Sequence, residues 1–369
     1  MSKDRVIFID YLKVIGLFCI ILAHVCTNQY VLQIRNFDVP LMVIISGFLA
    51  FDSYKRSMKS GSSIFNYYWK RISRLLIPTW IFLISYFTLV FLFSSITKGN
   101  YPYSFSAVLR SFLLLDGIGY VWIIRVYLIC SFLTPIFFYF NNKIKSGKRK
   151  FLILLIMYAF YEIAVFSGIN ESSVIFNFII AYAIPYGVIY ALGMLSKKTS
   201  AADDMKISIL SFMIFILSSI GILFICNGIQ PTQIMKYPPR IYYISYALFI
   251  SFLLLSIFKR ASLKKVDFIE FCSKSSLWIY LWHILFLNMI PLLFGQIHWI
   301  AFYFMVLMCS IALCHVQNRV IDKLETKALI KIFWNCSEDD TVPLHDKHND
   351  YWVKKFLIFL MIIQWVIKK

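Results

Sequence analysis

Long apolar runs recur along most of the chain, and each is close to the length that crosses a lipid bilayer. A membrane-spanning helix needs about 20 predominantly apolar residues. With 60% hydrophobic and only 15% charged residues, the chain lacks the polar surface that a water-soluble globule needs. We therefore predict an all-α membrane protein, a ten-helix transmembrane bundle. The apolar runs between polar breaks lie at 6–26, 36–52, 75–95, 119–140, 151–168, 174–195, 207–226, 240–258, 272–293 and 297–316.

The basic residues are distributed unevenly between the loops. Lys and Arg number 37 against 18 acidic residues, a formal net charge of +19. If Met1 is cytoplasmic, the cytoplasmic loops hold the basic clusters Lys55, Arg56, Lys59, Lys70, Arg71, Arg74, Lys143, Lys145, Lys148, Arg149, Lys150, Lys197, Lys198, Lys206, Lys259, Arg260, Lys264 and Lys265. The opposite turns hold Arg35, Lys98, Lys236 and Arg240. This asymmetry predicts that both termini are cytoplasmic, and it accounts for the positive charge without a nucleic-acid partner.

The C-terminal part of the chain has a different pattern. We predict a transmembrane domain at 1–316 and a cytoplasmic tail at 317–369, because the basic polar stretch after 316 interrupts the apolar runs. A last apolar run at 356–367 has about twelve residues, too few to cross about 30 Å of hydrocarbon at 1.5 Å per residue. A membrane-interfacial helix near 353–369 is the prediction, with an eleventh span as the alternative. His345 and His348, with Asp346 and Asp350 beside them, hint at a metal site. We predict a solvated tail instead, because such a loop offers no preformed geometry for a metal.

Three ionisable residues lie inside the first predicted span, where each is costly and therefore a functional hypothesis. They are Asp10, Lys13 and His24. Lys13 and His24 fall within about 20° of the same helix face, separated by a rise of roughly 16 Å. This spacing suits a long ligand whose charged head stays at the inner surface while its other end reaches the imidazole. The alternatives are a buried histidine bonded to a neighbouring span, and an i,i+3 ion pair of Asp10 with Lys13.

Two arginines lie at the inner end of the third predicted span. Arg71 and Arg74 share one helix face at the point where the chain enters the lipid. Guanidinium groups bind phosphates in a bidentate way, so the pair is a candidate phosphate site. The alternative is membrane anchoring by the positive-inside rule.

These residues form part of a longer ordered pattern. Asp10-x2-Lys13-x10-His24 is followed by Ser46-Gly47-Phe48 and by Lys70-Arg71-x2-Arg74-x3-Pro78. Further along come Val121-Trp122-Ile123-Ile124-x2-Tyr127-Leu128 and Ser273-x-Ser275-Ser276-Leu277-Trp278-Ile279-Tyr280-Leu281-Trp282-His283. In this order, over about residues 5–316, the motifs resemble the membrane acyltransferase-3 family.

The resemblance implies a ten-helix enzyme of the bacterial plasma membrane. Such an enzyme moves an acyl group, usually acetyl from acetyl-CoA, to a hydroxyl of a cell-surface carbohydrate or its lipid-linked precursor. The family's deep histidine maps to His24, and its paired arginines map to Arg71 and Arg74. Where this chain has Lys13 the family commonly has an arginine, so the planar fork of a guanidinium is missing at that position.

The expected mechanism follows from the charge of the donor. Acetyl-CoA is a polyanion, so its phosphates would stay at the cytoplasmic surface with Lys13, Arg71 and Arg74. Its thioester would reach His24, which takes a proton from the sugar hydroxyl and returns it to the departing thiolate. The alternative is a two-step route through an acetyl-histidine. Direct transfer needs no metal, and no metal is expected.

Four further residues are candidates for the site. Ser46, beside Gly47, is a candidate oxyanion donor, with small-residue helix packing as the alternative. Trp122 carries the fourth-span motif. Arg125 lies about one turn beyond it and points to a polar cavity, or else pairs with Glu162. His283 matches the family pattern, and its alternative is a packed core residue.

Aromatic residues gather at the predicted outer mouth of the eighth span. Tyr237, Tyr242 and Tyr243 lie beside Arg240. Aromatic side chains in this position could stack on sugar rings, and an interfacial aromatic belt is the alternative.

A transporter or flippase for a lipid-linked or anionic substrate is the alternative function, because buried charges in a ten-span bundle suit transport equally well. The set of Lys13, His24, Arg71 and Arg74 favours the acyltransferase. Inverted repeats or paired broken helices would favour a transporter, and we find neither in the sequence.

Overall fold

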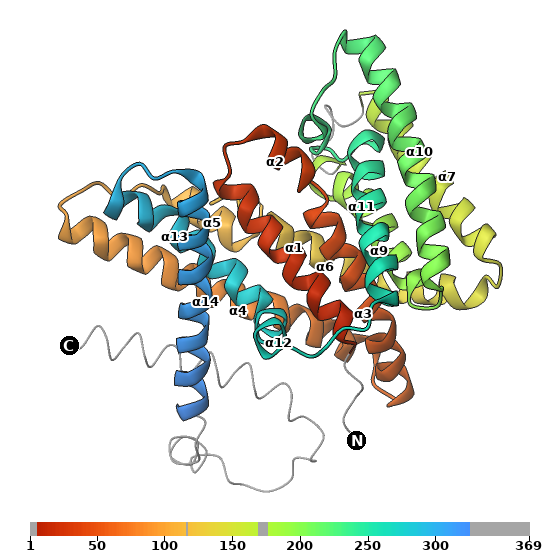
Figure 1. The fold of residues 1–369 in the computed structure, drawn as a ribbon. Helices are drawn as coiled ribbons and strands as arrows, with labels where there is room; N and C mark the ends of the chain where they lie inside the picture. The colour runs from red at the N-terminus through yellow and green to blue at the C-terminus, as the bar shows by residue number, and fades with distance from the viewer. Residues whose placement is uncertain (1–5, 116, 169–175, 325–369) are drawn as a thin grey trace, which may run out of the picture. The chain divides into compact units, whose positions relative to one another are not determined.

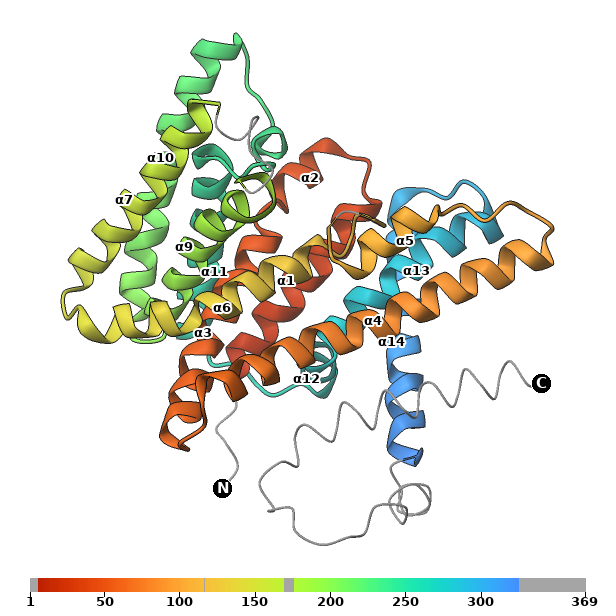
Figure 2. The same cartoon turned by 180° about the vertical axis from the view of Figure 1, so that it is seen from behind.

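The computed structural model describes residues 6–115, 117–168 and 176–324, and every regular element in these residues is helical (Figures 1 and 2). The chain divides into two compact units. Unit 1 takes the described parts of 1–67, 122–276 and 297–303, and unit 2 takes those of 68–121, 277–296 and 304–324.

Most of the helices belong to unit 1. They are α1 (Ile7–Val25), α2 (Gln29–Ile34), α3 (Asp38–Lys59), α6 (Trp122–Lys143), α7 (Gly147–Phe166), α9 (Ala181–Ser196), α10 (Ala201–Cys226), α11 (Ile241–Arg260) and α12 (Asp267–Lys274), with the short η1 (Phe176–Ile180) and η2 (Thr232–Met235). Unit 2 holds most of α4 (Ile64–Ile96), α5 (Phe105–Phe112), nearly all of α13 (Ser276–Phe294) and most of α14 (Trp299–Leu324).

Each of the ten predicted spans overlaps helical residues; the sixth falls on η1 and α9, and the ninth runs from the end of α12 into α13. Among the described residues, eight helical stretches are long and apolar enough to cross a membrane. The fifth and sixth predicted spans, α7 and α9, are outside this set; α9 is apolar but only 16 residues long. The all-α membrane class is therefore confirmed, whereas ten crossings and cytoplasmic termini stay predictions.

Unit 1 is packed around α3, which contacts α1, α6, α9 and α11. Two glycines bring α3 and α9 into backbone contact. A Cβ added to Gly47 would lie 2.1 Å from the carbonyl oxygen of Tyr190, and one added to Gly193 would lie 2.1 Å from that of Ile44. Because no larger side chain fits at either position, Gly47 serves the small-residue packing that the sequence offered as an alternative.

Unit 1 has two distinct ends. We call one end the histidine end: α1, which carries His24, and α7 finish there, and α3, α6, α9 and α11 begin there. We call the opposite end, where α1 and α7 begin and the other four helices finish, the lysine end. Contacts between helix termini fix this arrangement: Lys150 at the start of α7 donates to Asn141 at the end of α6 (2.6 Å), and Lys197 after α9 pairs with Asp52 on α3 (2.9 Å). Dense basic loops therefore meet at the lysine end, which is the distribution that the positive-inside rule predicts for cytoplasmic loops.

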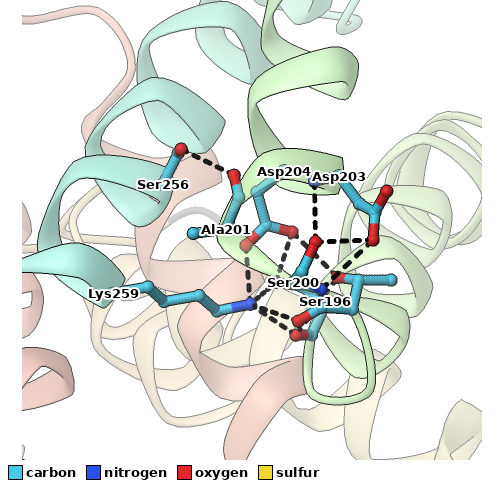
Figure 3. A network of polar contacts seen from close by, with 8 residues as sticks. Ser196, Ser200, Ala201, Asp203, Asp204, Ser256 and Lys259 are labelled. Atoms are coloured by element: carbon cyan, nitrogen blue, oxygen red, sulfur yellow. Dashed lines mark hydrogen bonds and ion pairs between the residues drawn. The ribbon is translucent and has the colours of Figure 1, made fainter.

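A buried ion pair joins three helices at the lysine end (Figure 3). Lys259 Nζ lies 2.6 Å from Asp204 Oδ2, and it also donates to the carbonyl and the hydroxyl of Ser196 at the end of α9. Ser200 and Asp203 form a capping box at the start of α10. The network fixes the ends of α9, α10 and α11.

Unit 2 is held together by bonds between its own helices. Trp80 Nε1 on α4 donates to Phe112 O at the end of α5 (3.1 Å), and Asn288 Nδ2 on α13 donates to the Tyr86 hydroxyl on α4 (3.2 Å). Trp282 Nε1 on α13 donates to Gln317 Oε1 on α14 (2.5 Å).

The structure extends the last helix beyond the predicted domain boundary. α14 continues to Leu324, eight residues past the expected end at 316. The rest of the predicted tail, including the interfacial helix near 353–369 and the histidines 345 and 348, lies outside the described residues.

Candidate functional site

His24 lies in the last turn of α1, at the histidine end of unit 1. The side chain is half-buried. The helix stops at Val25 because the next residue, Cys26, has extended backbone geometry. The imidazole is in the electrostatic range of two cations from other segments, Lys236 and Arg35. It is therefore in a charged setting and not in a purely apolar one.

The two cations share one carboxylate. Arg35 Nη1 lies 2.8 Å from Asp38 Oδ2, and Lys236 Nζ lies 3.9 Å from Asp38 Oδ1. Arg35, Asp38 and Lys236 are 5%, 1% and 4% exposed, so the three charges, here named the cationic triad, are buried together. Burial lowers the pKa of Lys236, and the Asp38 carboxylate opposes this effect.

A polar network joins the two loops that carry the triad. Asn36 Nδ2 donates to Thr232 Oγ1 (2.7 Å), and the Thr232 backbone N–H donates to Gln33 Oε1 (2.8 Å). Lys236 Nζ also donates to Asn36 Oδ1 (3.4 Å). The segment before α3 and the segment before α11, about 200 residues apart in sequence, are thereby held side by side.

Aromatic rings lie beside the triad. Trp122 at the start of α6 contacts the rings of Tyr237, Tyr182 and Tyr186, at centroid distances of 5.5, 6.0 and 6.3 Å. The Arg125 guanidinium lies over the Tyr182 ring, 4.7 Å from its centroid. We name Trp122, Tyr182, Tyr186 and Tyr237 the aromatic group.

At the lysine end, α1 contacts the short helix α12. Lys13 Nζ donates to Ser273 O (3.0 Å), and Ser273 Oγ donates to Asp10 Oδ1 (2.6 Å). A cavity of about 280 Å³ adjoins this contact and is lined by Ile7, Asp10, Tyr11, Lys265, Val266, Ile269 and Glu270. Lys13 thus lies toward the other end of α1 from His24, one turn from Asp10, which lines the cavity.

The comparison with protein families decides the class. The family model described as an acyltransferase domain, acyltransferase-3, matches residues 6–316. The chain belongs to the acyltransferase-3 family. No curated protein and no solved structure matches the chain. Together with its long apolar helices, the family membership makes this protein a multi-pass membrane acyltransferase, which favours the enzyme prediction over the transporter alternative.

The remaining predicted residues of this acyltransferase lie in several places. Ser46 is half-buried on α3. Arg71 and Arg74 lie on α4 in unit 2, the first half-buried and the second exposed. His283 is fully buried in unit 2, where its Nδ1 contacts the carbonyl oxygen of Tyr280 and its ring contacts Tyr120. These contacts fit the packed-core interpretation of His283.

The carboxylate of Glu162, the alternative partner of Arg125, is engaged elsewhere in this acyltransferase. Arg240 Nε lies 2.7 Å from Glu162 Oε2, and the Ile241 N–H and the Tyr158 hydroxyl both donate to Oε1. Glu162 therefore fixes the start of α11 against α7, and the structure places Arg125 against the aromatic group.

Sequence reasoning did not assign the cationic triad to the site. Arg35 and Lys236 entered only as exceptions in the sparsely charged outer turns, and Asp38 did not enter at all. The presence of Arg35 and Lys236 in the outer turns was the signal that could have identified the triad. The positive-inside rule disfavours basic residues in these turns, so such residues indicate a function other than topology. Among the described residues, no group of three or more His, Cys, Asp or Glu side chains could hold a metal ion.

Proposed function

We propose that this acyltransferase is an O-acetyltransferase of the bacterial plasma membrane. It transfers the acetyl group of acetyl-CoA to a hydroxyl of a cell-surface carbohydrate or its lipid-linked precursor, with His24 as general base. The observation that carries the proposal is the position of His24, half-buried at the end of α1 and in range of the buried cations Lys236 and Arg35.

The reaction follows from that position. An imidazole nitrogen of His24 takes the proton of the acceptor hydroxyl as its oxygen attacks the thioester carbonyl. The C–O bond forms, the C–S bond breaks, and the proton passes from the imidazole to the thiolate. Positive charge near the reacting carbonyl stabilises the oxyanion that develops on the way. General-base catalysis of this kind contributes about 10²–10⁴-fold to the rate.

The donor would bind along α1. Its phosphates need cations at a water-facing surface, and Lys13 supplies one at the lysine end. Arg71 and Arg74 are the proposed further phosphate ligands, because arginine binds phosphate in a bidentate way. From Lys13 to His24 the helix rises roughly 16 Å, a distance that the flexible arm of the donor can follow.

Mass spectrometry of surface glycans tests the proposal. Cells lacking the gene, complemented with the wild-type protein, should carry an acetyl-sized mass increment on a surface carbohydrate. His24→Ala should abolish the increment while the protein reaches the membrane in normal amount. The matched control is His298→Ala, since His298 is exposed before α14 and lies outside the proposed site; this variant should retain the increment. An unchanged glycan mass in wild-type and deleted cells would refute the assignment.

A further inference from the structure

The histidine end buries more positive than negative charge. Arg35 and Lys236 share Asp38, and no other carboxylate among the described residues pairs with either cation. Arg35 Nε is buried and has no hydrogen-bond partner within the part of the chain that the structure describes. The Tyr127 hydroxyl on α6, in the electrostatic range of Asp38, is likewise buried without a hydrogen-bond partner among the described residues.

A purely structural role does not account for this surplus. One cation is enough to neutralise Asp38, and an uncompensated charge in a low-dielectric interior is strongly unfavourable. Membrane topology also disfavours basic residues at the end opposite the basic loops. A second buried cation is therefore expected to have a function, and its natural partner is an anion that arrives with a ligand.

The aromatic group supplies the second part of a ligand site. Lys236 Nζ lies 5.7 Å from the centroid of the Tyr237 ring, and Tyr237 in turn contacts Trp122. Tyr237 is 50% exposed, so a ligand can reach the edge of the group. Aromatic rings offer flat apolar faces with polar edges, which match the faces and hydroxyls of a sugar.

We propose that the histidine end binds the acceptor as an anionic saccharide, with Lys236 and Arg35 facing its negative group and Trp122, Tyr182 and Tyr237 contacting its ring. The inference rests on the proposed acetyl transfer and adds the substrate class. The negative group is a carboxylate or a phosphate, both of which accept charge-assisted hydrogen bonds.

Saturation-transfer NMR on the full chain in nanodiscs tests this binding without requiring transfer. Three probes share one sugar ring: methyl glucoside, methyl glucuronide and methyl glucoside 6-phosphate. We expect at least one anionic probe to bind about tenfold more tightly than the neutral glucoside, because charge-assisted hydrogen bonds are stronger than those between neutral groups. The stronger anion then distinguishes the carboxylate from the phosphate.

Three variants separate charge from stacking. Lys236→Gln should bring the anionic and neutral probes to similar affinity, and Lys236→Arg should restore the preference, which shows that the fold is intact. Trp122→Ala should weaken all three probes together. Equal affinity of the wild-type protein for the three probes, or binding of none, would overturn the inference, as would a preference that survives Lys236→Gln.

The same probes keep this inference distinct from the proposed function. His24→Ala should bind the anionic probe as the wild-type protein does, because the imidazole is needed for transfer and not for holding the anion. An anionic preference without release of CoA thiol would refute the acetyl transfer and leave the binding site. Acetyl transfer with equal efficiency to neutral and anionic probes would do the opposite.

Discussion

At the scale of single residues, the buried charges of unit 1 divide by their place along the membrane-spanning helices. Lys13 and Asp10 contact Ser273 at the lysine end, while Arg35, Asp38 and Lys236 are buried together at the histidine end. His24 lies with the second set. The arrangement is suited to a donor that enters at one end and an acceptor that enters at the other.

In the structure Lys13 also donates a hydrogen bond to Ser273 on α12. A variant must therefore distinguish this structural contact from the proposed binding of phosphate. We expect Lys13→Met to raise the KM for acetyl-CoA by about tenfold, because one charge-assisted contact to phosphate is lost, with little change in kcat. Lys13→Arg should keep the KM low. The measurement is CoA thiol release by protein in nanodiscs, with the exposed Lys264→Met as control. An unchanged KM with a lowered Tm would show that Lys13 stabilises the contact with α12 and does not bind the donor.

At the scale of helices, stability depends on close contacts between elements and on how their ends are fixed. The α3–α9 contact is close enough to exclude a methyl group at Gly47 and at Gly193. The ends of α9, α10 and α11 share the network around Lys259 (Figure 3). Two substitutions test these features separately.

Gly47→Ala should destabilise the protein by about 1–3 kcal/mol, the usual cost of forcing a group into a packed contact. The added Cβ would lie 2.1 Å from Tyr190 O, and a backbone atom cannot move aside as a flexible side chain can. Thermal unfolding in detergent measures the effect. Gly221→Ala on α10 is the matched control, because its Cβ meets nothing within 4 Å. Equal Tm values for the two variants would contradict the close contact.

Lys259→Met should destabilise the protein by about 3–5 kcal/mol, because Asp204 is then left buried without its cation. The side chain of Asp204 is 0% exposed, so water cannot replace Lys259. Lys206→Met, which breaks the exposed pair with Asp203 one turn away, should leave the Tm unchanged. Restoration of the Tm in Lys259→Met/Asp204→Leu would identify the unpaired charge as the cause; a double variant no better than Lys259→Met would argue against it.

At the scale of the whole molecule, the distribution of basic residues predicts the membrane topology. The basic loops of unit 1 lie at the lysine end, and the sparse basic residues of the other end are mostly engaged by Asp38 and Glu162. This distribution predicts a membrane orientation with the lysine end in the cytoplasm.

Reporter fusions test that orientation. Alkaline phosphatase joined after Asn227, where α10 ends at the histidine end, should be active because the reporter is exported. The same reporter joined after Lys198, at the lysine end, should be inactive, and a fluorescent protein that folds only in the cytoplasm should give the reverse pattern. Activity of the phosphatase at both positions would contradict the predicted topology.

Local patterns in the sequence were enough to predict the all-α membrane class, the approximate places of the long apolar helices and the family. Each of these depends on local pattern: apolar length, the sign of charge in loops, and short ordered motifs such as those around His24 and Arg71. Such patterns can be recognised in the sequence without knowing which helices are in contact.

Which charges meet depends on the packing of the helices. Arg35 and Lys236 are about 200 residues apart, and they share Asp38 because α3 and α11 begin at the same end of unit 1. Likewise Glu162 binds Arg240 and not Arg125, a choice between two cations that spacing alone left open. Long-range pairing depends on the packing of helices around α3, and that packing depends on complementary side-chain surfaces, which no single segment of the sequence contains.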